Sequence, residues 1–255
     1  MTKLTVLITG GASGIGLGIA EHLGRMGHRI IIADINPDTA KQAASTLLNN
    51  DIDAVSVVLD VSDAAQIAAL PQQLNNEPID VLVNNAGIQH VAKLEDFPAD
   101  KWQLLINILL VGPALLTQAL LPAMKQRNFG RIINVGSIHS LVASPFKSAY
   151  VAAKHGLLGF SKTLALETGE FDITINTLCP SYVKTPLVEQ QIASQAKENN
   201  MSIDDVVNKI MLEPMPKKAF IEVSELAESA AFLLSPAAKN MTGQTLVLDG
   251  GWVAR

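Results

Sequence analysis

Short apolar runs rich in β-branched residues alternate along this chain with longer helical patterns, and this alternation restricts the possible folds most strongly. The strand-like runs are LTVLIT, RIIIAD, DAVSVVLD, IDVLVNNAG, GRIINVGS, ITINTLCP and QTLVLDGG. The helical patterns lie at about 14–26, 37–48, 62–74, 99–127, 148–168, 186–213 and 224–234. Continuous apolar strands separated by helices indicate a parallel sheet that is covered on both faces. The sequence therefore predicts an α/β fold built on a Rossmann-type, doubly wound parallel sheet.

The length and the charge of the chain limit its organisation and its partners. With 255 residues, 48% of them hydrophobic, it can fill the core of one large domain, so a single domain over 1–255 is expected. A net charge of −5 with scattered lysines and arginines argues against a nucleic-acid partner. Without a leader pattern or an apolar run of membrane-spanning length, a cytoplasmic protein is expected. No metal site is expected, and the single cysteine, Cys179, should be a buried thiol.

The stretch 187–218 is polar and long for a connection in such a sheet. We expect it to form a mobile helical lid over a substrate.

A glycine-rich motif, TGGASGIG, follows the first strand and opens the first helix. Gly10, Gly14 and Gly16 would allow a tight turn whose backbone N–H groups approach a pyrophosphate, although glycines also occupy ordinary turns. Asp34 ends the second strand 18 residues past Gly16, where a carboxylate can accept hydrogen bonds from ribose hydroxyls. It could instead be a strand-end or helix-capping residue. Because no arginine or lysine lies within 10–18 or between Asp34 and Thr39, the motif favours NAD over NADP.

A second cluster, SIHSLVASPFKSAYVAAKHG at 137–156, gathers polar side chains in a segment that is otherwise small and apolar. Tyr150 and Lys154 are four residues apart and should share one face of a helix. A nearby ammonium favours the phenolate, so Lys154, aided by the positive nicotinamide ring of NAD⁺, should lower the pKa of Tyr150 toward that of a usable general base. Ser137, at a strand end, could hold a substrate oxygen. The tyrosine–lysine spacing alone also occurs by chance in unrelated helices.

Taken together, TGGASGIG, NNAG at 84–87, Ser137, and Tyr150 with Lys154 resemble the short-chain dehydrogenase/reductase family over essentially the whole chain. The resemblance implies hydride transfer between a secondary alcohol or ketone and a nicotinamide cofactor. Tyr150 would be the acid/base, Lys154 would also hold the nicotinamide ribose, and Ser137 would orient the substrate. The implied cofactor-binding residues are Gly10, Ser13, Gly14, Ile15, Gly16, Asp34, Asp60, Val61, Asn85, Ala86, Gly87, Tyr150, Lys154, Pro180 and Val183. Asp60 could alternatively be a helix-capping residue.

Five further stretches resemble one branch of that family, the D-3-hydroxybutyrate dehydrogenases. They are GIQHVA, SIH, KSAYVAAKHG, TPLVEQQI and the terminal DGGW. The residues implied to bind substrate are Gln89, His139, Lys147 and Gln191 around a carboxylate, Trp252 at the methyl end, and Ser137 and Tyr150 at the reacting carbon. A small carboxylate needs a cation and several donors, which fits this set. Outside the resemblance, each of these residues could be an ordinary surface, loop or packing residue.

Two positions depart from the family pattern. Ser181 stands where the family usually has glycine, and Leu109 stands where its fourth catalytic residue, an asparagine, is expected. In the family that asparagine helps to hold a water linking the lysine to solvent. Asn107 is two residues away, about 200° around a helix, and should not replace it without a bulge.

Three functions remain open from the sequence. The first is reversible NAD-dependent oxidation of (R)-3-hydroxybutyrate to acetoacetate. The second is reduction of 3-oxoacyl thioesters or another small ketone, and Asp34 argues against it because such enzymes more often use NADPH. The third is a catalytically silent binding protein, which only Leu109 favours. The apolar faces of the helices near 99–127 and 148–168 resemble the contacts by which the family forms a homotetramer, so a homotetramer is expected.

Overall fold

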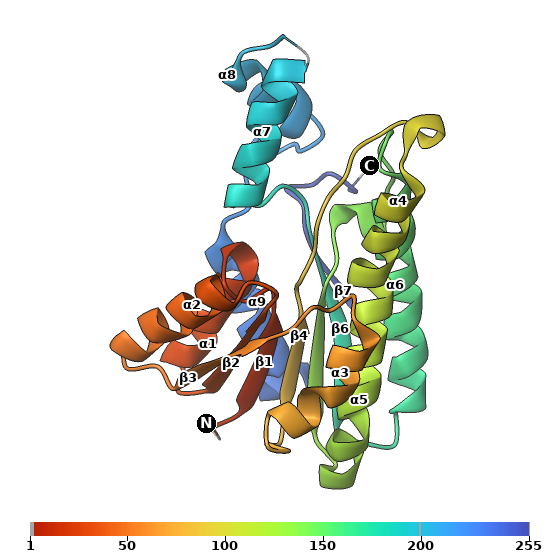
Figure 1. Cartoon of the computed structure of the whole chain (residues 1–255). Helices are drawn as coiled ribbons and strands as arrows, with labels where there is room; N and C mark the ends of the chain where they lie inside the picture. The colour runs from red at the N-terminus through yellow and green to blue at the C-terminus, as the bar shows by residue number, and fades with distance from the viewer. Residues whose placement is uncertain (1–2, 199, 255) are drawn as a thin grey trace.

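The computed structural model describes residues 3–198 and 200–254, and seven parallel strands form one sheet at its centre (Figure 1). The strands are β1 (Thr5–Thr9), β2 (Arg29–Asp34), β3 (Ala54–Val58), β4 (Val81–Asn84), β5 (Gly130–Val135), β6 (Ile173–Pro180) and β7 (Thr245–Leu248). Their order is β3-β2-β1-β4-β5-β6-β7, so the direction of winding reverses between β1 and β4. This order confirms the predicted doubly wound fold, in which a crevice for ligands opens at the carboxyl ends of the strands beside that reversal.

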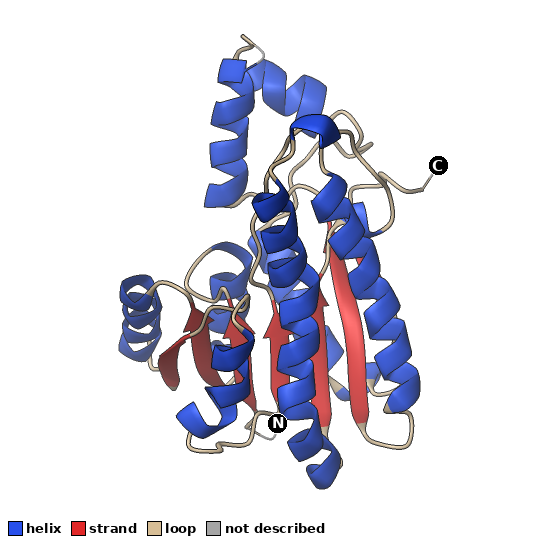
Figure 2. Ribbon diagram, turned by 45° about the vertical axis from the view of Figure 1, so that its right-hand side comes forward, coloured by secondary structure: helices blue, strands red, loops and turns tan. Residues whose placement is uncertain are grey.

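Helices cover both faces of the sheet, as Figure 2 shows for the face carrying the longest ones. They are α1 (Gly14–Arg25), α2 (Pro37–Asn49), α3 (Ala64–Gln73), α4 (Ala99–Ile106), α5 (Gly112–Arg127), α6 (Ser148–Glu167), α7 (Pro186–Glu198), α8 (Ile203–Val206) and α9 (Val223–Leu234). Side chains of α1, α2 and α9 pack on one face, and those of α3, α5 and α6 pack on the other. The predicted alternation of strands and helices is therefore confirmed, with boundaries shifted by a few residues.

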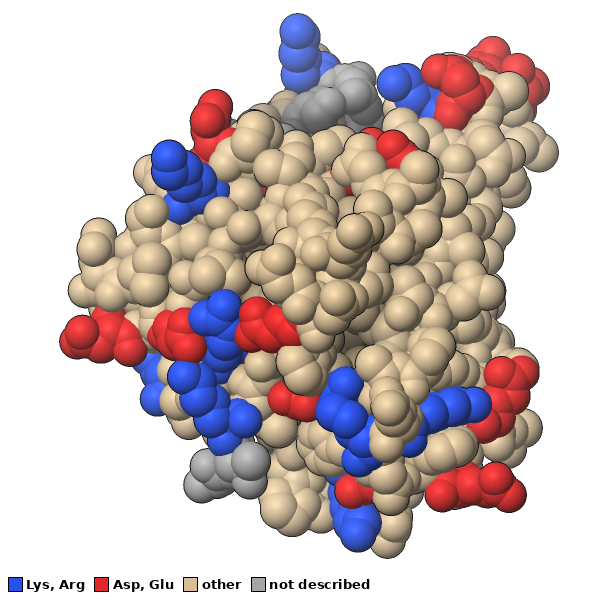
Figure 3. Space-filling model, turned by 60° about the horizontal axis from the view of Figure 1, so that its bottom comes forward, with Lys and Arg blue, Asp and Glu red and all other residues tan. Residues whose placement is uncertain are grey.

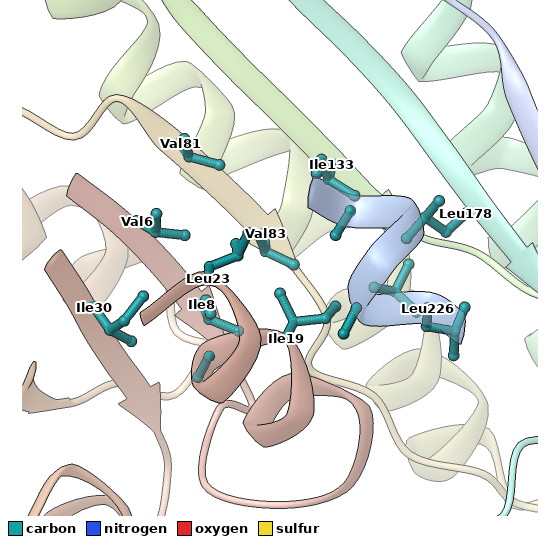
Figure 4. Close-up of a cluster of buried hydrophobic side chains, with 14 of the residues drawn as sticks. Val6, Ile8, Ile19, Leu23, Ile30, Val81, Val83, Ile133, Leu178 and Leu226 are labelled. Carbon is teal, nitrogen blue, oxygen red and sulfur yellow. The ribbon is translucent and has the colours of Figure 1, made fainter. Parts of the chain in front are cut away.

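Alternating strand residues supply each half of the core because successive side chains point to opposite faces. On one face, Val6 and Ile8 of β1 pack with Ile19 and Leu23 of α1 and Leu226 of α9, all fully buried (Figure 4). This packing holds the amino end of α1 at the carboxyl end of β1. The glycine-rich motif between them is thereby fixed at the crevice.

The predicted helix at 99–127 is continuous but contains a π-helical turn, Asn107–Val111, between α4 and α5. By length and composition this stretch could cross a membrane, which the sequence interpretation had overlooked. Leu105, Leu109 and Leu116 are buried in it against α6 and the sheet. At Gly112 an added Cβ would lie 2.4 Å from the Val61 carbonyl oxygen, so the helix passes unusually close to a neighbouring backbone.

The stretch predicted to be a lid contains α7, α8 and a second π-helical turn, Val207–Met211, and it stands above the carboxyl ends of the strands in Figure 1. Ile192, Val206 and Met211 form a small hydrophobic cluster of their own in this segment. The helical character of the segment is confirmed. Its mobility stays a prediction.

On the face shown in Figure 3, basic and acidic side chains are interspersed. At the amino ends of the strands, for example, Asp53 pairs with Lys3 at 2.8 Å and with Arg29, which also pairs with Glu77. These pairs lie at the end of the sheet opposite the crevice and take no part in the site described next.

Candidate active site

A cleft of about 540 Å³ lies at the carboxyl ends of the strands, where the sheet reverses its winding. The predicted site residues that line it are Gly10, Ser13, Gly14, Ile15, Asp34, Asp60, Val61, Asn85, Ala86, Gly87, Gln89, Ser137, His139, Lys147, Tyr150, Lys154, Pro180, Val183 and Gln191. Gly16 and Trp252 are not among the described residues that line it. The fold therefore brings together residues spread over most of the chain.

The glycine loop enters the cleft with its backbone in a conformation that favours glycine. Gly10 and Gly14 have φ values of +59° and +53°, and a Cβ on Gly10 would lie 2.9 Å from the Cα of Ala86. A Cβ on Gly16 would lie 2.5 Å from Nδ2 of Asn85. Gly10 and Gly14 therefore shape the cleft itself, whereas Gly16 lies behind it and allows close packing of α1.

The NNAG segment supports this loop from the neighbouring strand. Asn85 donates from Nδ2 to the carbonyl oxygens of Thr9 at 2.9 Å and Gly10 at 3.0 Å. In return, the Thr9 hydroxyl accepts from the backbone N–H groups of Asn85 and Ala86. The Asn85 side chain is thus occupied with holding the glycine loop, and the segment offers mainly its backbone and small side chains to the cleft.

The acidic residues at the cleft differ in their surroundings. Asp34 accepts hydrogen bonds from the backbone N–H groups of Ala12 and Asn36, which fix its carboxylate at the end of β2. Asp60 accepts from the N–H and hydroxyl of Ser62, while the helix cap of α3 is Asp63. The alternative role of Asp60 as a helix cap is therefore wrong. Asp60 instead forms a local turn at the edge of the cleft.

Helix α6 carries the predicted reacting pair. Lys154 is buried, donates from Nζ to the Val135 carbonyl oxygen at 2.6 Å, and lies 5.7 Å from the ring centre of Tyr150. Burial raises the pKa of Tyr150 and outweighs a lowering by its hydrogen bond to Ser137. Burial also lowers the pKa of Lys154 to about 8. The expected lowering of the Tyr150 pKa by Lys154, aided by the nicotinamide ring of NAD⁺, stays a prediction, because burial sets the direction of the shift in this structure.

A buried polar network anchors α6 to the sheet. Asn84 on β4 donates to Asn134 on β5 at 2.8 Å, and Asn134 donates to Ser161 on α6 at 2.9 Å. The Ser161 hydroxyl lies 3.1 Å from that of Thr177 on β6. Three strands are thereby linked to the helix that carries Tyr150 and Lys154, which fixes the position of that helix along the sheet.

The residues predicted to bind a carboxylate lie on the side of the cleft nearest the lid. Lys147 precedes α6, and burial lowers its pKa. Gln89 accepts from the N–H of His90 through its amide oxygen, so its amide N–H group remains for another partner. Gln191 on α7 is half-buried and faces the same cleft.

His139 is buried, and both of its ring nitrogens face serine hydroxyls. Nε2 lies 2.7 Å from Oγ of Ser144, and Nδ1 lies 3.4 Å from Oγ of Ser137. Burial, assisted by the charge of Lys147, lowers the pKa of His139 to about 4. Donation from His139 to a carboxylate stays a prediction that would require breaking the contact with Ser144.

Trp252 lies behind the cleft rather than in its wall. Its ring centre is 6.1 Å from that of His139 and 6.1 Å from that of Tyr182. Tyr182 lines the cleft, and its ring lies 5.8 Å from Nζ of Lys147. Sequence reasoning missed Tyr182 and Ser144. The position of Tyr182 directly after a strand end could have indicated it, whereas Ser144 had no local signal.

Leu109 occupies the cleft wall at the expected asparagine position, 1% exposed. Its Cδ2 would lie 3.1 Å from a Cβ on Gly87. The π-helical turn is the bulge that could have brought Asn107 inward, yet Asn107 accepts from Gln103 at the surface of α4. The prediction that Asn107 does not replace the missing residue agrees with this placement.

Residues 4–196 match the family model described as short chain dehydrogenase. A D-beta-hydroxybutyrate dehydrogenase of Cupriavidus necator is 43% identical over 253 residues, covering 98% of each chain. An uncharacterized oxidoreductase of Bacillus subtilis is 42% identical over 257 residues, covering 100% of each. The fold also matches an actinorhodin polyketide ketoreductase solved with NADPH, with a TM-score of 0.93 and 31% identity over 98% of this chain and 97% of that one. The chain therefore belongs to the short-chain dehydrogenase/reductase family of oxidoreductases, which use nicotinamide cofactors.

Proposed function

We propose that this oxidoreductase converts (R)-3-hydroxybutyrate, or a similarly short 3-hydroxy acid, reversibly to the 3-oxo acid with NAD⁺. The observation that carries the proposal is the place of Lys147. Its ammonium lines the same cleft as Tyr150, and among the described residues no carboxylate forms an ion pair with it. A half-buried cation without an anionic partner is an unfavourable feature that a substrate carboxylate would relieve.

The residues at the other end of the cleft suit an alcohol. The substrate hydroxyl would lie between Ser137 and Tyr150, and its proton would pass to the phenolate oxygen of Tyr150. Bound NAD⁺ would supply the hydride acceptor for the carbon that becomes the ketone. Lys147, Gln89 and Gln191 would hold the carboxylate, and Trp252 would lie at the methyl end. His139, also expected at the carboxylate, would join them only by giving up a serine contact.

The cleft also fits the proposed cofactor. The loop at Gly10 and Gly14 leads to the amino end of α1, whose N-cap residue Ser13 makes no side-chain cap, so backbone N–H groups there can receive a pyrophosphate. The fixed carboxylate of Asp34 can accept from both adenosine ribose hydroxyls and would repel a 2′-phosphate.

This arrangement predicts a preference for NAD⁺. We expect kcat/KM to favour NAD⁺ over NADP⁺ by at least about tenfold, equivalent to about 1.4 kcal/mol, because of the Asp34 carboxylate. Parallel assays with both cofactors measure the ratio, and Asp34→Ser should reduce it. Equal use of both cofactors by the native enzyme would contradict the assignment.

The substrate is tested by following nicotinamide absorbance with a panel of compounds. (R)-3-Hydroxybutyrate should react well, and its S enantiomer and methyl ester should react poorly. Efficient reduction of a 3-oxoacyl thioester with NADPH, together with inactivity toward the free acid, would instead support the reductase alternative. NADH binding without turnover of any compound would support the silent binding protein.

Leu109 should slow the enzyme without abolishing turnover, because the backbone of the helix can still hold a water that the usual asparagine side chain would assist. Leu109→Asn should therefore raise kcat modestly and leave KM for NAD⁺ nearly unchanged, as steady-state kinetics would measure. Activity that appears only in the asparagine variant would show that the native site is silenced.

The helical faces outside the site favour a homotetramer with D₂ symmetry. Val111 beside α5 is 39% exposed and Leu166 on α6 is 85% exposed, although both are apolar. We expect a tetrameric mass by light scattering at micromolar concentration. A monomeric mass would contradict this prediction.

A further inference from the structure

Ser144 completes a chain of side chains that ends at the reacting phenol. Its Oγ lies 2.7 Å from Nε2 of His139, and Nδ1 of the same ring lies 3.4 Å from Oγ of Ser137. Ser137 and Tyr150 both line the cleft, where donation from Ser137 lowers the pKa of the phenol. Ser144 is half-buried, whereas Ser137 and His139 are buried. This series of side chains therefore runs from a half-buried serine outside the lining of the cleft to Ser137 at its reacting end.

The direction of hydrogen-bond donation from Ser144 through His139 to Ser137 decides what the Ser137 hydroxyl can do. A hydroxyl has one proton to donate and two lone pairs with which to accept. Ser137 already accepts from the backbone N–H of His139 at 3.1 Å. If the His139 ring carries its proton on Nδ1, that N–H fills the second lone pair of Ser137. The Ser137 proton is then directed at Tyr150 or at a substrate oxygen.

In the other tautomer, Nδ1 carries no proton and competes for the proton of Ser137. Ser144 then accepts from Nε2 instead of donating to it. Ser137 therefore accepts from His139 in one tautomer and donates to it in the other, although the heavy atoms of these side chains do not move. Only the Nδ1–H tautomer leaves the Ser137 proton for the reacting oxygen.

We propose that Ser144 is a positioning residue that donates to Nε2 of His139, selects the Nδ1–H tautomer and thereby directs the Ser137 proton toward the reacting oxygen. The inference rests on the roles of Ser137 and Tyr150 in the proposed function. It does not depend on which 3-hydroxy acid is the substrate.

The surroundings keep His139 neutral, so that its tautomer is well defined. The ring is 4% exposed and packs edge-on against the rings of Tyr150 and Trp252. Burial and the positive charges of Lys147 and His155 lower the pKa of His139 to about 4. An imidazolium would donate from both nitrogens and would remove the choice between the tautomers.

Other groups act on Tyr150 independently of this chain. Lys154 lies on the same helix, and Cys179 and Tyr182 lie in β6 and in the segment after it. Cys179 and Tyr182 raise the pKa of Tyr150, whereas the hydrogen bond from Ser137 lowers it. Because none of these three groups contacts Ser144 in the described interactions, a substitution at Ser144 should act on Tyr150 through His139 and Ser137.

The phenolate of Tyr150 can be titrated directly. The chain has two tyrosines, so in a Tyr182→Phe background Tyr150 is the only one left. With NAD⁺ saturating, Ser144→Ala should raise the pKa of Tyr150 by about half a unit to one unit, read from near-ultraviolet phenolate absorbance. Ser144→Thr keeps a hydroxyl and should restore the parent value. Ser148→Ala, which removes a hydroxyl at the nearby start of α6, should leave that value unchanged.

Kinetics give an independent measure. Below the pKa of Tyr150, kcat for oxidation should fall by roughly three- to tenfold in Ser144→Ala, with a smaller change in KM, and should recover as the pH rises. An unshifted pKa of Tyr150 in Ser144→Ala, with the parent enzyme active, would overturn the inference. The ring ¹⁵N shifts of His139 in the native protein test it without any variant, and an Nε2–H tautomer in the NAD⁺ complex would also overturn it.

These outcomes separate the inference from the proposed function. If the native protein does not oxidise 3-hydroxybutyrate, the substrate assignment fails, yet the titration and the tautomer still report on Ser144. If it does oxidise 3-hydroxybutyrate but Ser144→Ala behaves as the parent does, only the role of Ser144 fails.

Discussion

Replacing Tyr150 by phenylalanine should reduce turnover by about 10²-fold or more while NADH binding survives. The variant removes the phenol that would exchange a proton with the substrate oxygen, and it leaves a ring of similar shape in the same wall of the cleft. Steady-state kinetics measure turnover, and NADH fluorescence measures binding. Because the other tyrosine, Tyr182, also lines the cleft, Tyr182→Phe is the matched control and should retain turnover within a few-fold.

The pH dependence of the native enzyme adds a second test of Tyr150. Oxidation needs the phenolate, and burial raises the pKa of this phenol, so the oxidation rate should increase as the pH rises through that pKa. Reduction needs the protonated phenol and should show the opposite trend. Near-normal turnover in Tyr150→Phe, with the same pH profile, would remove Tyr150 from the mechanism.

Lys147→Ala should lower kcat/KM for 3-hydroxybutyrate roughly 30-fold or more. This corresponds to a loss of about 2 kcal/mol or more in transition-state stabilisation. The substitution removes a charge-assisted contact in a part of the cleft where burial already lowers the pKa of the lysine. Lys162→Ala, which removes an exposed lysine from the same region of chain, should leave kcat/KM unchanged.

The methyl ester of the substrate distinguishes lost binding from general damage. The native enzyme should prefer the acid strongly, whereas Lys147→Ala should treat acid and ester more equally. If the native enzyme oxidises both equally well, Lys147 does not bind a carboxylate and the proposed substrate class is wrong.

Much of the architecture could be predicted because it depends on periodicity. The four-residue spacing of Tyr150 and Lys154 places both on one helix face, and the apolar strands indicate a parallel sheet whose carboxyl ends form the crevice. Asp34 could be placed for the same reason, since it ends a strand beside the point where the winding reverses.

Other features depend on contacts that no local pattern contains. The ammonium of Lys154 is directed at the Val135 carbonyl, 19 residues away, and burial raises the pKa of Tyr150. Gly16 matches the glycine motif, yet its missing side chain makes room for Asn85 rather than for a ligand. The pairing of His139 with Ser144 needs the turn between them, whose course the sequence alone does not specify.

The polar network from Asn84 through Asn134 and Ser161 to Thr177 has a consequence for how enzymes of this kind diversify. This network binds α6, which carries Tyr150 and Lys154, to the sheet. None of its residues belongs to the segment above the cleft. The helix that carries Tyr150 and Lys154 is therefore positioned independently of that segment, which contributes Gln191 to the cleft. Grafting residues 186–218 from a relative that acts on a different alcohol should change the range of compounds accepted while leaving the hydride-transfer machinery intact.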